Sequence, residues 1–83
     1  MSDQTQQATE LTARQTWLLR EIHAQGGRWK TGRARTAYSR ALLGDVHVDR
    51  VRHDLQVLHK HGHLHQIDES GVRYYLLRED GDA

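Results

Sequence analysis

The stretch that decides the fold lies at residues 48–58, which read VDRVRHDLQVL. Its apolar residues follow a three-four-three spacing: Val48, Val51, Leu55 and Leu58. Because an α-helix has about 3.6 residues per turn, this spacing places the four side chains on one face. The sequence therefore predicts a helix over about 47–61 that buries this stripe. Gly62 then supplies the residue that best tolerates the left-handed conformation after a helix.

The residues that follow this helix show the pattern of a β-hairpin. Residues 63–68 and 72–77 form two strand-like runs, separated by Glu69-Ser70-Gly71. A glycine in that loop suits the positive φ angle of hairpin turns, and VRYYLL in the second run has high β propensity. Since successive strand side chains point to opposite faces, we expect one of Tyr74 and Tyr75 to face the core and the other to be exposed.

Upstream of residues 48–58, the sequence predicts a first helix that begins near Thr12. Thr12 and Gln15 fit a capping box, in which each side chain accepts a hydrogen bond from the backbone amide of the other residue. The apolar stripe of this helix is narrow: Leu18, Leu19 and Ile22, with Trp17 beside it. We expect Trp17 in the core; the alternative is a partially exposed patch that could support dimerisation. Gly26-Gly27 is expected to end the helix.

A second helix is predicted over about 32–43, with Thr31 as its N-cap and Gly44 at its end. One face of it carries mostly small residues: Ala34, Ala37, Tyr38 and Ala41. These small side chains would let the helix pack close to its neighbours. Trp29 is the lone apolar residue between the first two helices, so we expect it to anchor a short extended segment to the core.

The predicted order is helix, extended piece, helix, turn, helix and hairpin, which indicates an α+β fold with a three-helix core and a C-terminal β-hairpin. With 83 residues, the chain suits one small domain. We place that domain at residues 11–78. The polar residues 1–10 and the acidic residues 79–83 are expected to be disordered tails.

Charge is distributed unevenly along the chain, although the formal net charge is only +1. All twelve Lys and Arg residues lie within residues 11–78, together with six of the eleven Asp and Glu residues. The other acidic residues lie in the two terminal segments. A basic domain of this kind favours a polyanionic partner.

Residues 48–58, Gly62, Leu64 and residues 71–77 together resemble the winged helix-turn-helix DNA-binding proteins. In that superfamily the third helix often reads V-R-x-D-L-x-x-L, ends at a glycine, and is followed by a hairpin called the wing. The resemblance covers about residues 11–78, and GGRWKTGRARTAY at residues 26–38 is similar to small winged-helix proteins of actinobacteria. The resemblance implies a bacterial transcriptional regulator whose third helix lies in the DNA major groove.

Residues that could contact DNA cluster on the side of the third helix that lies opposite its apolar stripe. Arg50 can pair bidentately with guanine, and Gln56 can pair with adenine. His47 and His53 join Arg50 as candidates for reading bases, while Asp49 either accepts from cytosine or serves the start of the helix. For Asp54 we expect an intramolecular ion pair with Arg50.

Further basic residues surround the predicted start of the second helix, where free backbone amides favour a phosphate. Arg73 follows the hairpin turn and could reach a phosphate or the minor groove. The predicted DNA-binding residues are Arg28, Lys30, Thr31, Arg33, Arg35, His47, Arg50, Arg52, His53, Gln56 and Arg73. A solvated basic surface is the alternative interpretation of these side chains.

Residues 59–65 read HKHGHLH and hold four of the seven histidines. We expect His63 and His65 to share one strand face, where they could chelate a metal weakly together with His59 or His61. A metal- or pH-responsive DNA-binding repressor is therefore an alternative function. The simpler interpretation is a helix end and a strand that happen to carry histidines near an anionic partner.

A third possibility is a protein–protein interaction module, because a fold does not fix a function. An enzyme is not expected: the chain has no cysteine, and GGRWKTGR lacks the spacing of a phosphate-binding loop. No cofactor or metal is predicted. We expect a cytoplasmic protein that binds double-stranded DNA, makes no membrane contact, and is a monomer or a weak homodimer formed on DNA.

Overall fold

A computed structural model describes residues 11–41 and 44–78. The predicted disordered tails lie outside these residues. Within them, three helices are followed by one two-stranded antiparallel sheet, which confirms the predicted α+β fold with a C-terminal hairpin. The elements are α2 (Ala13–Gln25), α3 (Thr31–Arg40), α4 (Val48–Lys60), β1 (Leu64–Glu69) and β2 (Val72–Leu77).

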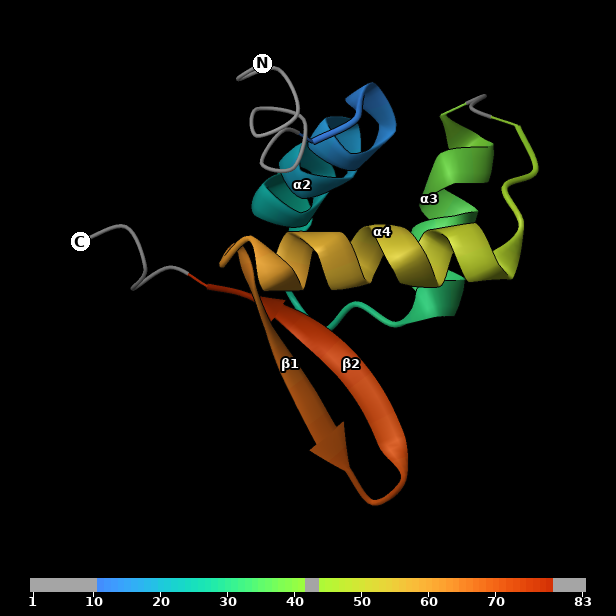
Figure 1. The fold of residues 1–83 in the computed structure, drawn as a ribbon. Helices are drawn as coiled ribbons and strands as arrows, with labels where there is room; N and C mark the ends of the chain where they lie inside the picture. The colour runs from blue at the N-terminus through green and yellow to red at the C-terminus, as the bar shows by residue number, and fades with distance from the viewer. Residues whose placement is uncertain (1–10, 42–43, 79–83) are drawn as a thin grey trace, which may run out of the picture.

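Helix α4 lies across α2 and α3, and the hairpin of residues 64–77 extends away from the three helices (Figure 1). The core between these elements draws side chains from every one of them. Its buried members are Leu18, Ile22, Trp29, Ala34, Tyr38, Val51, Leu55, Leu58, Leu64 and Tyr75. Three of the four residues in the predicted stripe of α4 are among them, and Val48 at its first position is only half-buried.

Helix α2 begins and ends as predicted. The Thr12 hydroxyl accepts a hydrogen bond from the Gln15 amide, and the Gln15 side-chain oxygen accepts one from the Thr12 amide, both at 3.0 Å. The capping box is therefore confirmed. After Gln25 the chain turns at Gly26 and Gly27, whose φ angles of 65° and 82° are positive.

Helix α3 differs from the predicted 32–43: its N-cap is not Thr31, and it ends before Ala41, while residues 42 and 43 lie outside the described part of the chain. Lys30 occupies the cap position without a side-chain hydrogen bond, Thr31 is the first helical residue, and the helix ends at Arg40. The reason lies in Trp29, whose backbone N–H and C=O pair with Tyr75 of β2 at 2.9 Å each. This pairing keeps the chain extended up to Lys30, so the helix begins directly after it. It also confirms that Trp29 anchors an extended segment to the core.

The hairpin pairs Leu64 with Leu77 and continues in register to Glu69 with Val72. The expected exposure of one tyrosine is wrong, because Tyr74 and Tyr75 are only 7% and 4% exposed. Tyr75 enters the core. On the opposite face, the guanidinium of Arg28 lies 4.8 Å from the Tyr74 ring centroid and shields the ring from solvent.

Asp54 does not pair with Arg50, which corrects the expectation from the sequence. Its side chain is fully buried beneath α4 and accepts hydrogen bonds from three residues, Arg14, Gln15 and Tyr38. The Arg14 guanidinium donates twice, at 2.6 and 2.9 Å. Position 54 lies three residues after Val51 and four before Leu58, so helical geometry places it on the buried stripe.

Burial by itself raises the pKa of the Asp54 carboxyl, but the hydrogen bonds from Arg14, Gln15 and Tyr38 outweigh it and hold this pKa below its ordinary value. Burial raises the pKa of the Tyr38 phenol, as does its hydrogen bond to Asp54. The carboxylate is therefore charged at neutral pH and joins α2, α3 and α4 through one group.

Candidate nucleic-acid interface

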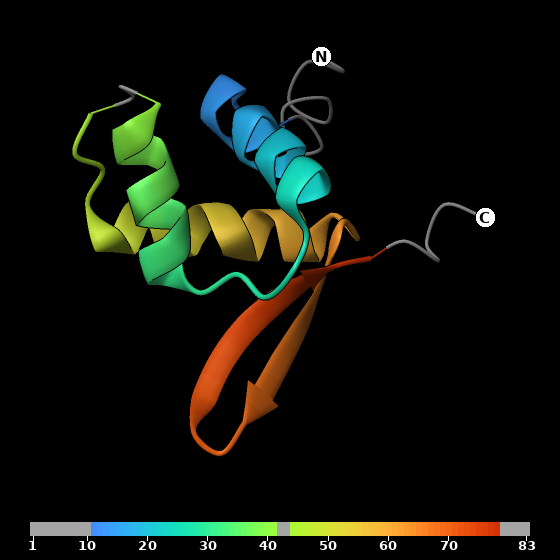
Figure 2. The same cartoon turned by 180° about the vertical axis from the view of Figure 1, so that it is seen from behind.

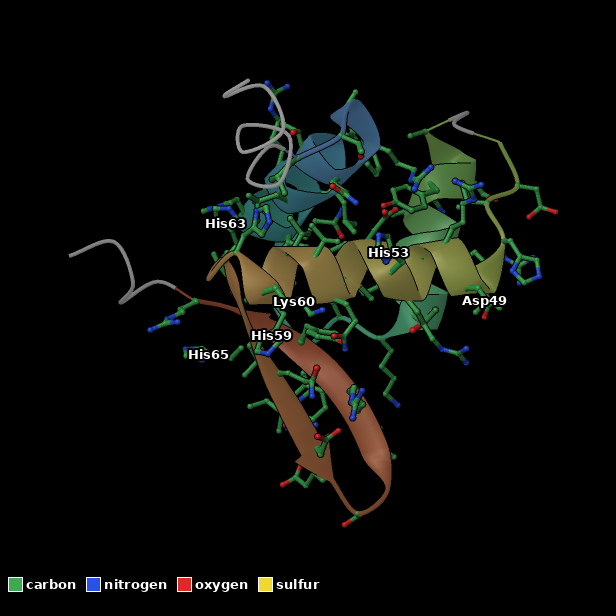
Figure 3. All side chains as sticks on the ribbon, viewed as in Figure 1. Asp49, His53, His59, Lys60, His63 and His65 are labelled. Atoms are coloured by element: carbon green, nitrogen blue, oxygen red, sulfur yellow. The ribbon has the colours of Figure 1, made fainter. Side chains whose placement is uncertain are left out.

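The outward side of α4 carries a row of exposed polar side chains that we call the outer face: Asp49, Arg50, Arg52, His53 and Lys60. Figure 3 shows Asp49, His53 and Lys60 spread along the helix. The face exists because residues 51, 54, 55 and 58 turn inward, so the positions between them turn outward. The structure thus brings the predicted residues Arg50, Arg52 and His53 onto one surface.

The N-terminal end of this face is organised by His47, which lies at the N-cap. Its Nδ1 atom accepts a hydrogen bond from the Asp49 amide at 3.1 Å. Asp49 in turn accepts a hydrogen bond from the Arg52 guanidinium at 3.2 Å. Asp49 also lies in the first turn of α4, where the helix dipole favours a negative charge. His47 remains exposed at the end of the face.

Arg50 and His53, like Lys60 further along the helix, are uncommitted members of the outer face. Both are exposed, and neither forms a hydrogen bond or ion pair within residues 11–41 and 44–78. An arginine and an imidazole in this state can donate to an external acceptor without first losing an internal one.

A groove of about 470 Å³ runs between α4 and the hairpin. We call it the hairpin groove. It is lined by Thr31, Arg52, Gln56, Asp68, Gly71, Arg73 and Tyr75. Four of the predicted DNA-binding residues, from three different elements, therefore lie around one concave surface: Thr31, Arg52, Gln56 and Arg73.

Gln56 is directed toward the hairpin. Its Nε2 atom donates to the Gln66 side-chain oxygen and to the Tyr75 hydroxyl, each at 2.9 Å. The amide predicted to read adenine is thus engaged in holding the hairpin against α4. Neither Gln66 nor Tyr75 was predicted as a site residue, because only the register of β1 against β2 places them opposite each other.

Arg73 lies on β2 at the mouth of the hairpin groove. Its Nε donates to Asp68 at 2.7 Å, and both side chains are about half exposed. The hydrogen bond from Arg73 lowers the pKa of the Asp68 carboxyl below its ordinary value. Solvent screens an exposed pair of this kind, so it contributes little to stability and a phosphate can replace the carboxylate.

The four cations predicted around the start of α3 do not converge on one site, because only Arg28 and Lys30 lie together. Arg33 lies over Trp29, with the guanidinium 4.0 Å from the ring centroid, and also donates to Gln25. Arg35 pairs with Asp45 at 3.3 Å. Arg28 and Lys30 line a small hollow beside the hairpin turn, and Lys30 is exposed there.

The histidines of residues 59–65 do not converge. Figure 3 shows His63 and His65 on different sides of the junction between α4 and β1, which corrects the expectation that they share a face. The physical reason is that β1 begins at Leu64, so His63 lies outside the strand. The Nδ1 atom of His59 lies 3.0 Å from the Leu64 carbonyl oxygen, so this imidazole contacts the backbone of β1. Among the described residues, no group of three or more His, Cys, Asp or Glu side chains is placed to hold a metal ion.

No family model matches this chain, and no curated protein or solved structure matches it either. Within the described residues, no helix has the length and apolar character needed to cross a membrane. The candidate interface therefore stands on its own geometry.

Proposed function

We propose that this protein is a sequence-specific double-stranded DNA-binding protein that acts in the cytoplasm as a transcriptional regulator. In this proposal the outer face of α4 enters the major groove and the hairpin lies against the DNA backbone beside it. The observation that carries the proposal is the position of uncommitted Arg50 and His53 on an exposed helix, next to a groove that holds Arg52 and Arg73. The resemblance to winged helix-turn-helix proteins supports the same assignment.

The dimensions of α4 fit this role. Its 13 residues span about 20 Å, and a helix with its side chains is about 10–12 Å across. The major groove of B-DNA is about 12 Å wide and admits a helix. Since the hairpin extends away from the helices (Figure 1), it does not block the outer face of α4.

Base reading falls to Arg50 and His53 in this arrangement. A guanidinium donates two hydrogen bonds to the O6 and N7 atoms of guanine, a pairing worth about 1–3 kcal/mol against the wrong base. His53 lies three residues further along the same face and donates to an acceptor on a neighbouring base or to a phosphate.

Phosphate contacts fall to cations at the edges of the face. Lys60 is exposed near the C-terminal end of α4, and Lys30 is exposed beside the hairpin turn. Arg52 and Arg73 can exchange their exposed carboxylate partners for phosphate oxygens. These contacts fix the position of the protein on the duplex but do not read sequence.

Salt dependence tests whether the protein binds DNA at all. Fluorescence anisotropy with a pool of labelled genomic duplexes should show binding at about 50 mM salt that weakens steeply toward about 200 mM, because phosphate neutralisation releases counterions. Four phosphate contacts predict a slope of about −3.6 in a plot of log K against log salt concentration. Absence of binding to any duplex at the lower salt concentration would contradict the proposal.

A further inference from the structure

A second concave surface lies between α2 and α3, which stand in front of α4 in the view of Figure 2. We call it the α2–α3 groove. Its volume is about 520 Å³, within the range of about 300–1,000 Å³ that is typical of small-molecule sites. The side chains that matter are Trp17, Glu21, Trp29, Arg33, Ala37 and Arg40. It faces away from the outer face of α4, so it is separate from the proposed DNA interface.

Both tryptophans of the chain line this groove. Trp29 is fully buried, and Trp17 is partly exposed, with its ring centroid 5.7 Å from that of Tyr38. Ala37 lies on the α3 side and has no side chain beyond Cβ to fill the space. The result is a hollow that is only about half apolar, with the accessible side of Trp17 as its aromatic wall, which suits a flat ligand that carries a polar group.

The rim of the groove is positively charged. Arg33 and Arg40 lie seven residues apart on α3, which places them on the same side of the helix. Arg33 stacks on the Trp29 ring and donates to the Arg28 carbonyl oxygen, so its guanidinium plane is fixed. Arg40 is exposed and has no hydrogen bond or ion pair within the described part of the chain. The Glu21 carboxylate on the α2 side accepts a hydrogen bond from Gln25.

We infer that the α2–α3 groove binds a small planar aromatic anion, such as an aryl carboxylate. The ring lies between Trp17 and the Arg33–Trp29 stack, and the carboxylate pairs with the free guanidinium of Arg40. Stacking on an arginine that already covers a tryptophan combines apolar contact with a cation–π interaction. A partner helix, about 10–12 Å across, is too large to enter a hollow of this volume.

Calorimetric titration with 2-naphthoate and with the neutral 2-naphthamide tests this inference, because the two ligands share a shape and differ in charge. The expected result is that naphthoate binds about tenfold tighter or more, which corresponds to about 1.4 kcal/mol. In a nitrogen-15 NMR spectrum, naphthoate should shift the two indole N–H signals, from Trp17 and Trp29. Failure of both ligands to bind, or equal affinity for both, would overturn the inference.

Two variants separate the groove from the rest of the surface. Arg40→Gln should abolish the preference for naphthoate over naphthamide, whereas Arg20→Gln, which removes an exposed cation of α2 that does not line the groove, should retain it. Ala37→Leu should weaken the binding of both ligands, and circular dichroism of this variant checks that the fold persists. A preference that survives Arg40→Gln unchanged would overturn the assigned position of the anion.

Discussion

Asp54 places a negative charge at the centre of the three-helix core, where Arg14, Gln15 and Tyr38 donate hydrogen bonds to it. A buried carboxylate is tolerated only when its lone pairs are satisfied. Within the described residues, every buried side-chain nitrogen and oxygen has a hydrogen-bond partner. Because the partners come from α2 and α3, this single residue fixes how both helices meet α4.

Replacement of Asp54 by asparagine should destabilise the protein by about 2–3 kcal/mol, since it removes charge-assisted hydrogen bonds. The depressed pKa adds a pH dependence with a definite sign. The contribution of Asp54 is present above its ordinary value of 3.8 and is lost as the pH falls through that value toward the lower pKa of the folded state.

Urea denaturation between about pH 7 and pH 3 measures both effects. Asp54→Asn should flatten the loss of stability at acid pH, while Asp68→Asn, at an exposed and solvent-screened ion pair, should change stability at neutral pH far less than Asp54→Asn does. An Asp54→Asn protein that retains the stability and the acid profile of the original would show that this network does not hold the core.

The sequence indicates that Asp54 is buried, but it does not indicate which residues donate hydrogen bonds to it. Its position on the stripe of Val51 and Leu58 predicts burial, yet Arg14 lies 40 residues away and only the folded chain brings the two together. The same limit applies to Tyr74, whose burial depends on an arginine from the segment before α3. Periodicity identifies which face is buried, and it carries no information about which distant side chain covers an exposed ring.

At the scale of elements, the junction between α4 and the hairpin decides the shape of the candidate interface. Gln56 joins Gln66 and Tyr75, while the backbone of Trp29 pairs with Tyr75 from the other side. The hairpin is thus held by two independent attachments.

The helix boundaries at α2 and α4 were predictable from caps and glycines. The start of α3 was not, because pairing with β2 determines it.

The turn of the hairpin gives an element-scale prediction. Ser70 and Gly71 have φ angles of 51° and 79°, the pattern of a two-residue turn with two positive φ values. A Cβ at Gly71 would meet no atom within 4 Å, so the cost of Gly71→Ala comes from the backbone alone. Thermal denaturation should show a loss of about 1–2 kcal/mol.

Gly32→Ala is the matched control for that substitution. Gly32 lies in the first turn of α3, and its Cβ would also meet open space. Because its backbone is helical, alanine should stabilise the protein by about 0.5–1 kcal/mol. Equal effects of the two substitutions would contradict the positive φ assigned to Gly71.

At the scale of the whole molecule, the protein presents two faces with different chemistry. The outer face of α4 and the hairpin groove expose hydrogen-bond donors beside acidic partners that phosphates can replace. The α2–α3 groove, on the side shown in Figure 2, is lined by tryptophans and rimmed by arginines. Most residues of the outer face and the hairpin groove were predicted from the sequence. The α2–α3 groove was not predicted, because its walls come from two helices whose packing the sequence pattern does not show.

The affinity of Arg50→Ala for a duplex selected from a random pool tests DNA recognition by α4 most directly. Loss of one bidentate guanine contact predicts affinity lower by about 1–3 kcal/mol, roughly 5- to 150-fold, and relaxed preference at one base pair. Arg20→Ala removes an equal charge from α2 and should leave the affinity nearly unchanged. Equal losses in the two variants, or none in Arg50→Ala, would contradict recognition of DNA by the outer face of α4.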